Sequence, residues 1–227
     1  MKQKYWSNHK WVTCRSKLPT FIKWSFSEIH KVLPANKKLS ILDLGVGDGK
    51  LILSLPRTHQ FIGLDSCKEQ LDLADLQAKK QGTKIKLILS DFTSIPLADN
   101  TIDVVVSNAS LHHGKHKAII FSEVYRVLKT PGIFIFADFY NEFGRKYSTL
   151  INNNIKKNKL FAKAFTKSLC DTYNDIPMEV RKNHPEEYHV DPYKLLTLLS
   201  SAGFKNKILP GYDPAYSIIC ARKLEAQ

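Results

Sequence analysis

The sequence predicts an α/β protein built on a doubly wound, mostly parallel seven-stranded sheet. From residue 39 onward, short apolar runs alternate with amphipathic segments of helical periodicity. Such alternation is typical of β-α-β units, whose right-handed crossovers give a parallel sheet with helices on both faces. The first apolar run ends in closely spaced glycines, and acidic residues stand at three successive runs. These features together predict a ligand site at the carboxyl edge of the sheet.

Size and composition agree with one folded domain. The 227 residues are 43% hydrophobic, and no apolar run approaches the ~18 residues that a membrane-spanning helix needs. The four cysteines have long, irregular spacings, which predict neither a zinc site nor a disulfide framework. The basic N-terminus lacks the apolar stretch of a secretory signal, so the expected location is cytoplasmic.

The net charge of +13 is concentrated in two segments that flank a neutral centre. Residues 1–40 carry nine Lys or Arg against one acid, and residues 141–170 carry seven against one. Residues 41–140 carry eleven of each sign. A positive field of this kind attracts nucleic acid, anionic membrane or an acidic substrate, and an ordinary solvated surface explains it equally well.

The core helices and strands are predicted from the hydrophobic periodicity and from the prolines and glycines that end each segment. Pro56 and Gly82 mark the ends of the first two helices. The predicted helices are 48–55, 68–80 and 117–128, the last followed by a turn at Pro131 and Gly132. The predicted strands are 40–44, 60–64, 84–89, 102–106 and 132–136, and the fifth strand runs on to residue 138.

The alternation breaks after the fifth strand and resumes at Asp191. That residue is a good N-cap, and Pro192 suits the first helical position of a helix closed by Gly203. Two last strands are expected at 204–209 and 215–221. The resulting division is a helical N-terminal extension (1–39), an α/β core (40–138), a basic helical insertion (139–190) and the C-terminal completion of the core (191–227). The extension and the insertion are expected to form a lid.

The turn after the first strand is the strongest chemical signal. It reads Ile41-Leu42-Asp43-Leu44-Gly45-Val46-Gly47-Asp48-Gly49, and its glycines permit a tight turn that a ligand can approach closely. The third glycine stands one position too early for the G-x-G-x-x-G spacing of nicotinamide enzymes. Asp43 lies inside the strand, where a carboxylate suits an ammonium group and repels a pyrophosphate.

Two further acids follow the next two strands. Asp65 ends the second strand, 20 residues past Gly45, where a carboxylate can accept both hydroxyls of a ribose. Asp91 follows the third strand, where it can bond an adenine amino group while Phe92 packs near the ring. Each acid alone is more often a cap or a loop residue, but three at successive strand ends predict a nucleoside site.

Residues 39–140 resemble the class I S-adenosylmethionine-dependent methyltransferases, in particular the branch of ubiquinone and menaquinone C-methyltransferases (methyltransferase type 11 domain). The likeness rests on the glycine turn and the Asp65 strand end, and it continues through 91–105, 107–113 and 123–132. Segment 91–105 is similar to the branch pattern D-x-x-x-L-P-F-x-D-x-S-F-D.

The resemblance implies a Rossmann-like fold and S-adenosylmethionine as cofactor. It also implies contacts from Asp43, Gly45 and Gly47 to the methionine part, from Asp65 to the ribose, and from Asp91 with Phe92 to the adenine. Ser66 and Asn108 complete the expected cofactor-binding set.

The expected reaction is methyl transfer to a small, hydrophobic or aromatic acceptor. Segment 107–110 lacks the prolines of the Asn/Asp-Pro-Pro-Tyr/Phe loop that amino-directed nucleic-acid methyltransferases place there. This counts against methylation of a base amino group, though not against every RNA reaction, and nucleic acid is not the expected partner. Two alternatives stay open: an RNA- or protein-directed methyltransferase that docks through its basic flanks, and a non-catalytic S-adenosylmethionine-binding partner protein. The sequence assigns no oligomeric state.

The sequence identifies the catalytic residue less clearly than the cofactor site. Residues 112–116 hold three histidines, but no carboxylate adjoins them in the sequence and the resembled family needs no metal, so no metal site is predicted. His113 is preferred over His112 as a general base or pocket residue. Asp138 and Tyr140, at the end of the fifth strand, and His189, before the helix capped by Asp191, are the alternatives.

The basic insertion has two interpretations. Between Arg145 and Lys167 there are seven Lys or Arg and no acid, interleaved with apolar residues at helical spacing. Its apolar side either packs on the core as a substrate lid or lies on an anionic membrane, which would place the protein weakly and peripherally there.

Overall fold

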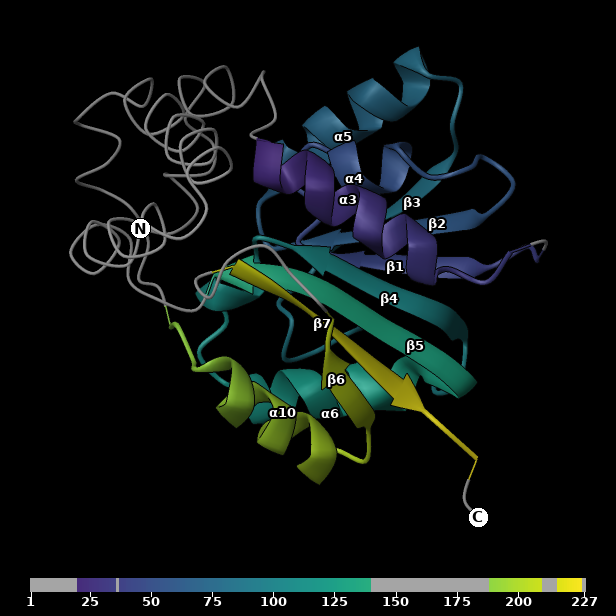
Figure 1. Cartoon of the computed structure of the whole chain (residues 1–227). Helices are drawn as coiled ribbons and strands as arrows, with labels where there is room; N and C mark the ends of the chain where they lie inside the picture. Colours follow the sequence, from purple (N-terminus) through teal and green to yellow (C-terminus); the bar gives the residue numbers. More distant parts are fainter. Residues whose placement is uncertain (1–19, 36, 140–187, 210–215, 226–227) are drawn as a thin grey trace, which may run out of the picture.

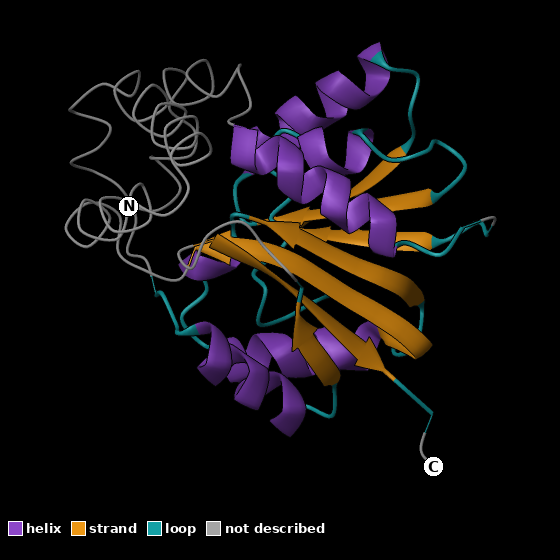
Figure 2. Ribbon diagram, viewed as in Figure 1, coloured by secondary structure: helices purple, strands orange, loops and turns teal. Residues whose placement is uncertain are grey.

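The computed structural model describes residues 20–35, 37–139, 188–209 and 216–225. Within these ranges, seven strands form one sheet in the order β3-β2-β1-β4-β5-β7-β6, with helices on both faces (Figures 1 and 2). The predicted doubly wound α/β class is confirmed. The strands are β1 (Ser40–Leu44), β2 (Gln60–Asp65), β3 (Ile85–Leu89), β4 (Ile102–Asn108), β5 (Leu128–Phe139), β6 (Lys205–Ile208) and β7 (Tyr216–Lys223).

The sheet is parallel from β3 to β5, and β7 runs antiparallel to both β5 and β6. The strand order reverses around β1, which pairs with β2 on one side and with β4 on the other. In an open α/β sheet this reversal opens a crevice at the carboxyl ends of the strands, where ligands bind.

Helices cover the two faces unequally. Helices α3 (Thr20–Val32), α4 (Lys50–Leu53) and α5 (Lys68–Lys80) lie on one face, and α6 (Lys117–Val127) and α10 (Pro192–Ser201) lie on the other (Figure 1). Each face of the sheet carries its own hydrophobic core. Because side chains alternate along each strand, Ile41 belongs to one of these cores and Leu42 to the other. A short 3-10 turn, η1 (Leu111–His113), connects β4 to α6.

Several boundaries differ from the sequence prediction, among them those of the first core helix and of the fifth strand. The helix expected at 48–55 is only α4, because Gly47 and Gly49 adopt positive φ angles and keep the preceding residues in the turn. The fifth strand begins at Leu128 rather than at 132, so Pro131 and Gly132 lie within β5 instead of a separate turn. Its register against β4 jumps from Ile102↔Leu128 to Val104↔Ile133, and the chain between them bulges.

The predicted start of α10 is confirmed. The Asp191 side chain accepts hydrogen bonds from the backbone N–H groups of Tyr193 (2.9 Å) and Lys194 (3.4 Å), and Pro192 occupies the first turn. This cap fixes where the chain enters the second layer of helices, directly after residues 188–190.

Several predictions fall outside the described residues. These are the first part of the N-terminal extension, most of the 139–190 insertion including Tyr140 and Arg145–Lys167, and the start of the last strand at residue 215. The described part of the N-terminal extension contains α3. Among the described helices, none is both long enough and apolar enough to cross a membrane.

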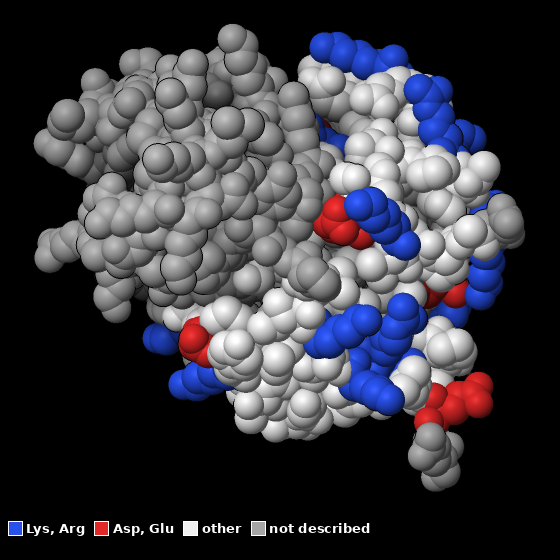
Figure 3. All heavy atoms as spheres, in the orientation of Figure 1, with Lys and Arg blue, Asp and Glu red and all other residues white. Residues whose placement is uncertain are grey.

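Edge strand β6 carries exposed positive charge. Lys205 and Lys207 are exposed on this strand, and Lys205 pairs across to the exposed Arg222 of β7. On the face drawn in Figure 3, basic side chains gather over these two strands. Exposed lysine charges on an edge strand oppose its pairing with a further strand, so they protect this edge of the sheet from association.

Arg126 of α6 clamps the loop that follows Asp91. Its guanidinium donates to the carbonyl oxygens of Ile95 and Leu97, both at 2.8 Å, and to Glu123 of its own helix. Glu123 in turn accepts from the Ile95 N–H at 2.9 Å. The two segments that carry much of the methyltransferase resemblance therefore hold each other in place.

Replacing Arg126 with Gln is expected to lower the free energy of unfolding by about 2–4 kcal/mol, because two partly buried carbonyls and Glu123 lose charge-assisted bonds. Denaturant unfolding measures the loss. The matched control is Asp99→Asn, which removes only the exposed partner of the same guanidinium and should cost less than about 1 kcal/mol. Equal losses in the two variants would show that the clamp does not stabilise the loop.

Candidate functional site

The glycine turn lies at the point where the strand order reverses. The N–H groups of Gly45 and Val46 both donate to the Leu64 carbonyl of β2, at 2.8 and 3.1 Å. Gly45 has φ +76°, and a Cβ atom there would lie 2.5 Å from both Cβ and Oγ of Ser110. This position therefore requires glycine for its backbone conformation and for the close approach of Ser110.

Two serines attach the end of β4 to the end of β1. The hydroxyls of Ser107 and Ser110 each donate to the Leu44 carbonyl at 2.8 Å. The sequence analysis assigned no role to Ser110, because this residue is far from the glycine turn in the sequence and comes beside it only in the fold. The bonds hold η1 beside the glycine turn.

Asp43 is a buried carboxyl group with an unsatisfied oxygen. The residue is 1% exposed, and its Oδ2 has no hydrogen-bond partner in the part of the chain that the structure describes. Burial, and then the negative charges of Asp65 and Asp48, raise the pKa of Asp43 to about 8. A cationic donor placed at Oδ2 would relieve both the missing bond and the like-charge repulsion.

Asp65 shapes the turn from the end of β2. Its Oδ2 accepts from the Gly47 N–H and its Oδ1 from the Cys67 N–H, both at 3.0 Å. Each oxygen of a carboxylate can accept more than one bond, so these contacts orient the group and leave capacity for a diol. A Cβ atom on Gly47 would meet nothing closer than 3.7 Å, so the turn is open to a ligand there.

The two residues expected at an adenine ring differ in their placement. The Phe92 ring lies against the turn, with Cζ 3.2 Å from the position of a Cβ on Gly45. Asp91 is exposed, and its Oδ1 accepts from the N–H (2.9 Å) and the hydroxyl (2.7 Å) of Thr93. Asp91 therefore orders its own loop, while Phe92 reaches the turn.

The remaining expected cofactor residues flank this arrangement. Asn108, at the end of β4, accepts a hydrogen bond from the Ser25 hydroxyl of α3 at 3.1 Å. Ser66 is exposed in the turn between β2 and α5. Asn108 thus ties the N-terminal helix to the carboxyl edge of the sheet, and Ser66 lies beside Asp65.

The candidate catalytic residues come together around His112, which the sequence analysis ranked below His113 as a general base. His112, rather than His113, contacts Asp138: its Nδ1 lies 2.6 Å from Oδ1, and its N–H donates to Oδ2 at 2.8 Å. No carboxylate adjoins the histidines in the sequence, but β5 runs beside β4 and brings Asp138 to η1. The described residues contain no group of three or more side chains arranged to hold a metal.

His113 and His189 lie beside this pair. The ring centroids of His112 and His113 are 4.0 Å apart, and the His189 ring stacks on His112 at 5.4 Å with an interplanar angle of 5°. The structure therefore gathers three of the four expected catalytic residues, and Tyr140 lies outside the described residues. The contact between His112 and Asp138 could not be predicted from the sequence, because the two residues are 26 positions apart.

The donor set fits S-adenosylmethionine. The unsatisfied oxygen of Asp43 suits the α-ammonium of a methionine moiety, and the open face of Gly47 admits a ligand next to Asp65. Asp65 lies beside Gly47, where the sequence places the carboxylate for a ribose, and the Phe92 ring offers an apolar surface. A pyrophosphate would instead bring its charge against buried Asp43.

Removing the Asp65 carboxylate is expected to weaken binding of S-adenosylhomocysteine by about 2–4 kcal/mol, because two charge-assisted hydrogen bonds to the ribose are lost. Calorimetric titration of Asp65→Ala against the wild type measures this. Asp75→Ala is the matched control, since Asp75 pairs with Lys79 on the exposed side of α5. Unchanged affinity in Asp65→Ala would rule it out as the ribose ligand.

The chain is similar in sequence to known methyltransferases. Residues 42–136 match the family described as "Methyltransferase domain". The chain is 30% identical over 102 residues to an uncharacterized methyltransferase, YcgJ, of Bacillus subtilis, covering 44% of this chain and 40% of that protein. It is 28% identical over 149 residues to an arsenite methyltransferase of Aquipseudomonas alcaligenes, covering 55% and 43%. It is 33% identical over 97 residues to a demethylmenaquinone methyltransferase of Lactobacillus johnsonii, covering 40% of each.

A solved structure agrees with the fold. A SAM-dependent methyltransferase of Methanosarcina mazei superposes with a TM-score of 0.63 at 22% identity, covering 87% of this chain and 97% of that one. The aligned segments of the three relatives above span less than half of those proteins.

Proposed function

We propose that residues 42–136, which match a methyltransferase domain, bind S-adenosylmethionine, and that the chain transfers a methyl group to a small acceptor molecule. The observation that carries the proposal is the buried, unsatisfied oxygen of Asp43 under the glycine turn. A protein retains such a costly group where a cationic ligand compensates it.

Each feature of the turn has a separate task in this proposal. Asp43 would bind the ammonium group, Asp65 the ribose hydroxyls, and Phe92 one face of the adenine. Gly45 and Gly47 would let the ligand approach the backbone, with Asp91, Ser66 and Asn108 holding the surrounding loops. The bound sulfonium supplies an activated methyl group.

The protein contributes alignment and exclusion of water. In-line attack on a methyl group needs the acceptor held on the far side of the carbon, and correct positioning alone supplies much of the rate. The cluster of His112, His113, Asp138 and His189 lies next to the glycine turn, where the acceptor would have to be. Apolar side chains of Leu111, Phe121 and Phe136 stand beside this cluster.

The acceptor proposed here is hydrophobic or aromatic and small. The apolar lining beside the histidines supports it, and the names of two relatives, an arsenite and a demethylmenaquinone methyltransferase, show that small acceptors of different chemistry occur among similar proteins. Docking on an anionic membrane through the 145–167 segment remains a proposal for delivery of a lipid-soluble acceptor.

The direct experiment is a screen for methylated products. Purified protein is incubated with methyl-labelled S-adenosylmethionine and a small-molecule extract, and mass spectrometry reports compounds that gain one labelled methyl group. The expected result is one such compound with stoichiometric S-adenosylhomocysteine. Labelling confined to RNA or to protein in matched reactions would overturn the small acceptor, and binding without any turnover would leave a cofactor-binding partner protein.

A further inference from the structure

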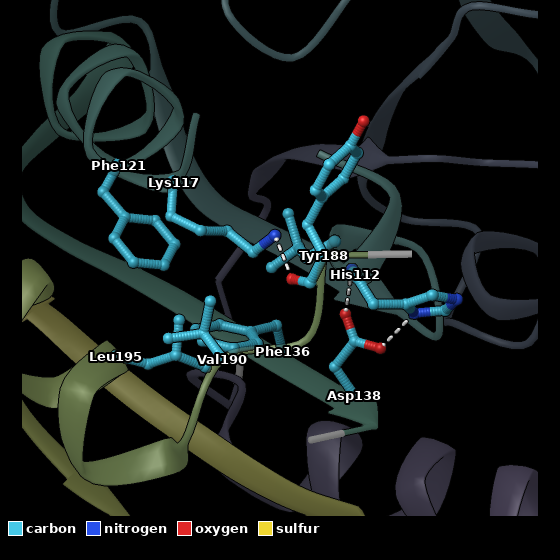
Figure 4. A pocket seen from close by; sticks show the side chains of 9 residues that line it. His112, Lys117, Phe121, Phe136, Asp138, Tyr188, Val190 and Leu195 are labelled. Carbon is cyan, nitrogen blue, oxygen red and sulfur yellow. Dashed lines mark hydrogen bonds and ion pairs between the residues drawn. The ribbon is translucent and has the colours of Figure 1, made fainter. Parts of the chain in front are cut away.

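The His112–Asp138 pair is a buried polar contact at the carboxyl edge of β4 and β5. The two side chains are 7% and 4% exposed, and Asp138 engages His112 through both carboxylate oxygens. One oxygen holds the backbone N–H and the other holds Nδ1, so the ring has a fixed orientation (Figure 4). With Nδ1 assigned as the proton-bearing nitrogen by this contact, Nε2 is the basic nitrogen of the neutral ring.

The pair lies next to the proposed methyl donor site. His112 follows Ser110 by two residues, and the Ser110 side chain fills the space beside Gly45. Asp138 is the next residue after Ala137, which pairs with Asn108 at the end of β4. The dyad therefore belongs to the carboxyl edge of β4 and β5, adjacent to the turn that ends β1.

Residues 188–190 shelter the dyad from one side. The Tyr188 N–H donates to the His112 carbonyl at 2.6 Å, and the His189 ring stacks on the His112 ring. Lys117 donates to the carbonyl of Gly114 and, at 3.0 Å, to that of Tyr188. Burial lowers the pKa of Lys117 to about 8, against the opposing effect of Asp138.

The surroundings are apolar apart from these groups. Leu111, Phe121, Phe136, Val190 and Leu195 complete the lining of a small pocket beside Asp138 (Figure 4). An acid and an imidazole buried together in such a setting cost desolvation energy. A carboxylate in contact with Nδ1 fixes the tautomer of the ring and stabilises the imidazolium that forms when Nε2 takes up a proton.

Resting on the proposed function, we propose that His112 is the general base of the reaction, positioned by Asp138, and that the acceptor is a phenol or thiol whose reacting atom carries a proton. Nε2 of His112 takes the proton from the acceptor oxygen or sulfur. That atom forms a bond to the methyl carbon while the carbon–sulfur bond of the sulfonium breaks, and its electron pair stays on sulfur, giving a neutral thioether. Asp138 stabilises the imidazolium that results.

Acceptors that react through a lone pair alone need no such base. Pyridines and dialkyl sulfides carry no proton on the reacting atom, so they would gain nothing from the dyad. The inference therefore separates two acceptor classes within the same overall reaction.

The test uses two probe sets with methyl-labelled S-adenosylmethionine: phenols and thiophenols on one side, pyridines and dialkyl sulfides on the other. Wild-type protein is expected to methylate members of the first set. His112→Asn keeps a donor for Asp138 but has no basic nitrogen, and it should lower that rate about 100-fold or more while S-adenosylhomocysteine affinity stays within twofold. His116→Gln, at an exposed histidine three residues after His113, is the control and should keep the wild-type rate.

Asp138→Asn gives a second reading if His112→Asn folds poorly. It should lower kcat and shift the pH–rate profile, to which Asp138, His113, His189 and Lys117 all contribute as neighbours of His112. Wild-type protein that binds S-adenosylhomocysteine but methylates only the lone-pair set, or no proton-bearing probe, overturns the inference. So does full activity of His112→Asn. Failure to bind S-adenosylhomocysteine at all would instead overturn the proposed function.

Discussion

Asp43→Asn is expected to weaken S-adenosylhomocysteine binding about 10- to 100-fold, because a hydrogen bond from an ammonium to a charged partner contributes about 1.5–3 kcal/mol. Asparagine keeps the shape of the side chain and removes only the charge. Calorimetric titration of the two proteins at pH 7 measures the change. The exposed Asp72→Asn, on the outer side of α5, is a control that should leave affinity unchanged.

The same substitution is expected to stabilise the free protein. The pKa of Asp43 is raised from 3.8 to about 8, so between these pH values the native state holds a proton that the unfolded chain has lost. The stability of the wild type therefore falls as pH rises through this window and levels off above about pH 8. Asp43→Asn lacks this term, so its free energy of unfolding should exceed that of the wild type most clearly near pH 8.

Binding should also be linked to proton release. An ammonium beside Asp43 favours the carboxylate, so the wild type should release close to one proton on binding at pH 7, and its affinity should rise between pH 6 and 7.5. Titrations in buffers of different ionisation enthalpy measure that proton. Equal affinity and equal proton release in wild type and Asp43→Asn would show that the ligand does not reach this carboxyl group.

Gly45→Ala is expected to cost about 2–5 kcal/mol of stability, since it combines a left-handed backbone conformation with overpacking. The added Cβ would stand 2.5 Å from Ser110, whose hydroxyl is held by the Leu44 carbonyl and cannot move without losing that bond. Cofactor binding should fail with it, because the turn and η1 would be pushed apart.

Gly82→Ala separates the two contributions. Gly82 has φ +65°, but a Cβ there meets nothing within 4 Å, so only backbone strain of about 1 kcal/mol is expected. Denaturant unfolding of both variants gives the difference. Similar losses at the two positions would mean that Ser110 yields easily and that the close approach at Gly45 is unimportant.

The sequence could predict those features whose cause is local. The strands around Ile41 and Ile62 are short, mainly apolar runs. The glycine turn, the Asp191 cap and the ends of α5 follow from residue types at fixed spacing. The position of Asp65 beside the turn followed from the rule that parallel strands end at one edge.

The features that it could not predict depend on contacts between distant segments. The choice of His112 over His113 is decided by Asp138, 26 residues further on, and by the direction in which η1 turns its side chains. The early start of β5 depends on pairing with Ile102, which overrides the turn preference of Pro131 and Gly132. Lys117 looked like an ordinary helix-start residue, and its burial arises from residues 188–190 packing over it.

The central claim is that the Asp43 turn binds the methionine and ribose of S-adenosylmethionine. Titration of the full chain with S-adenosylhomocysteine and, separately, with NAD tests it most directly. The account predicts saturable binding of S-adenosylhomocysteine, lost or strongly weakened in Asp43→Asn and Asp65→Ala, and no binding of NAD. Binding of NAD without binding of S-adenosylhomocysteine would contradict it.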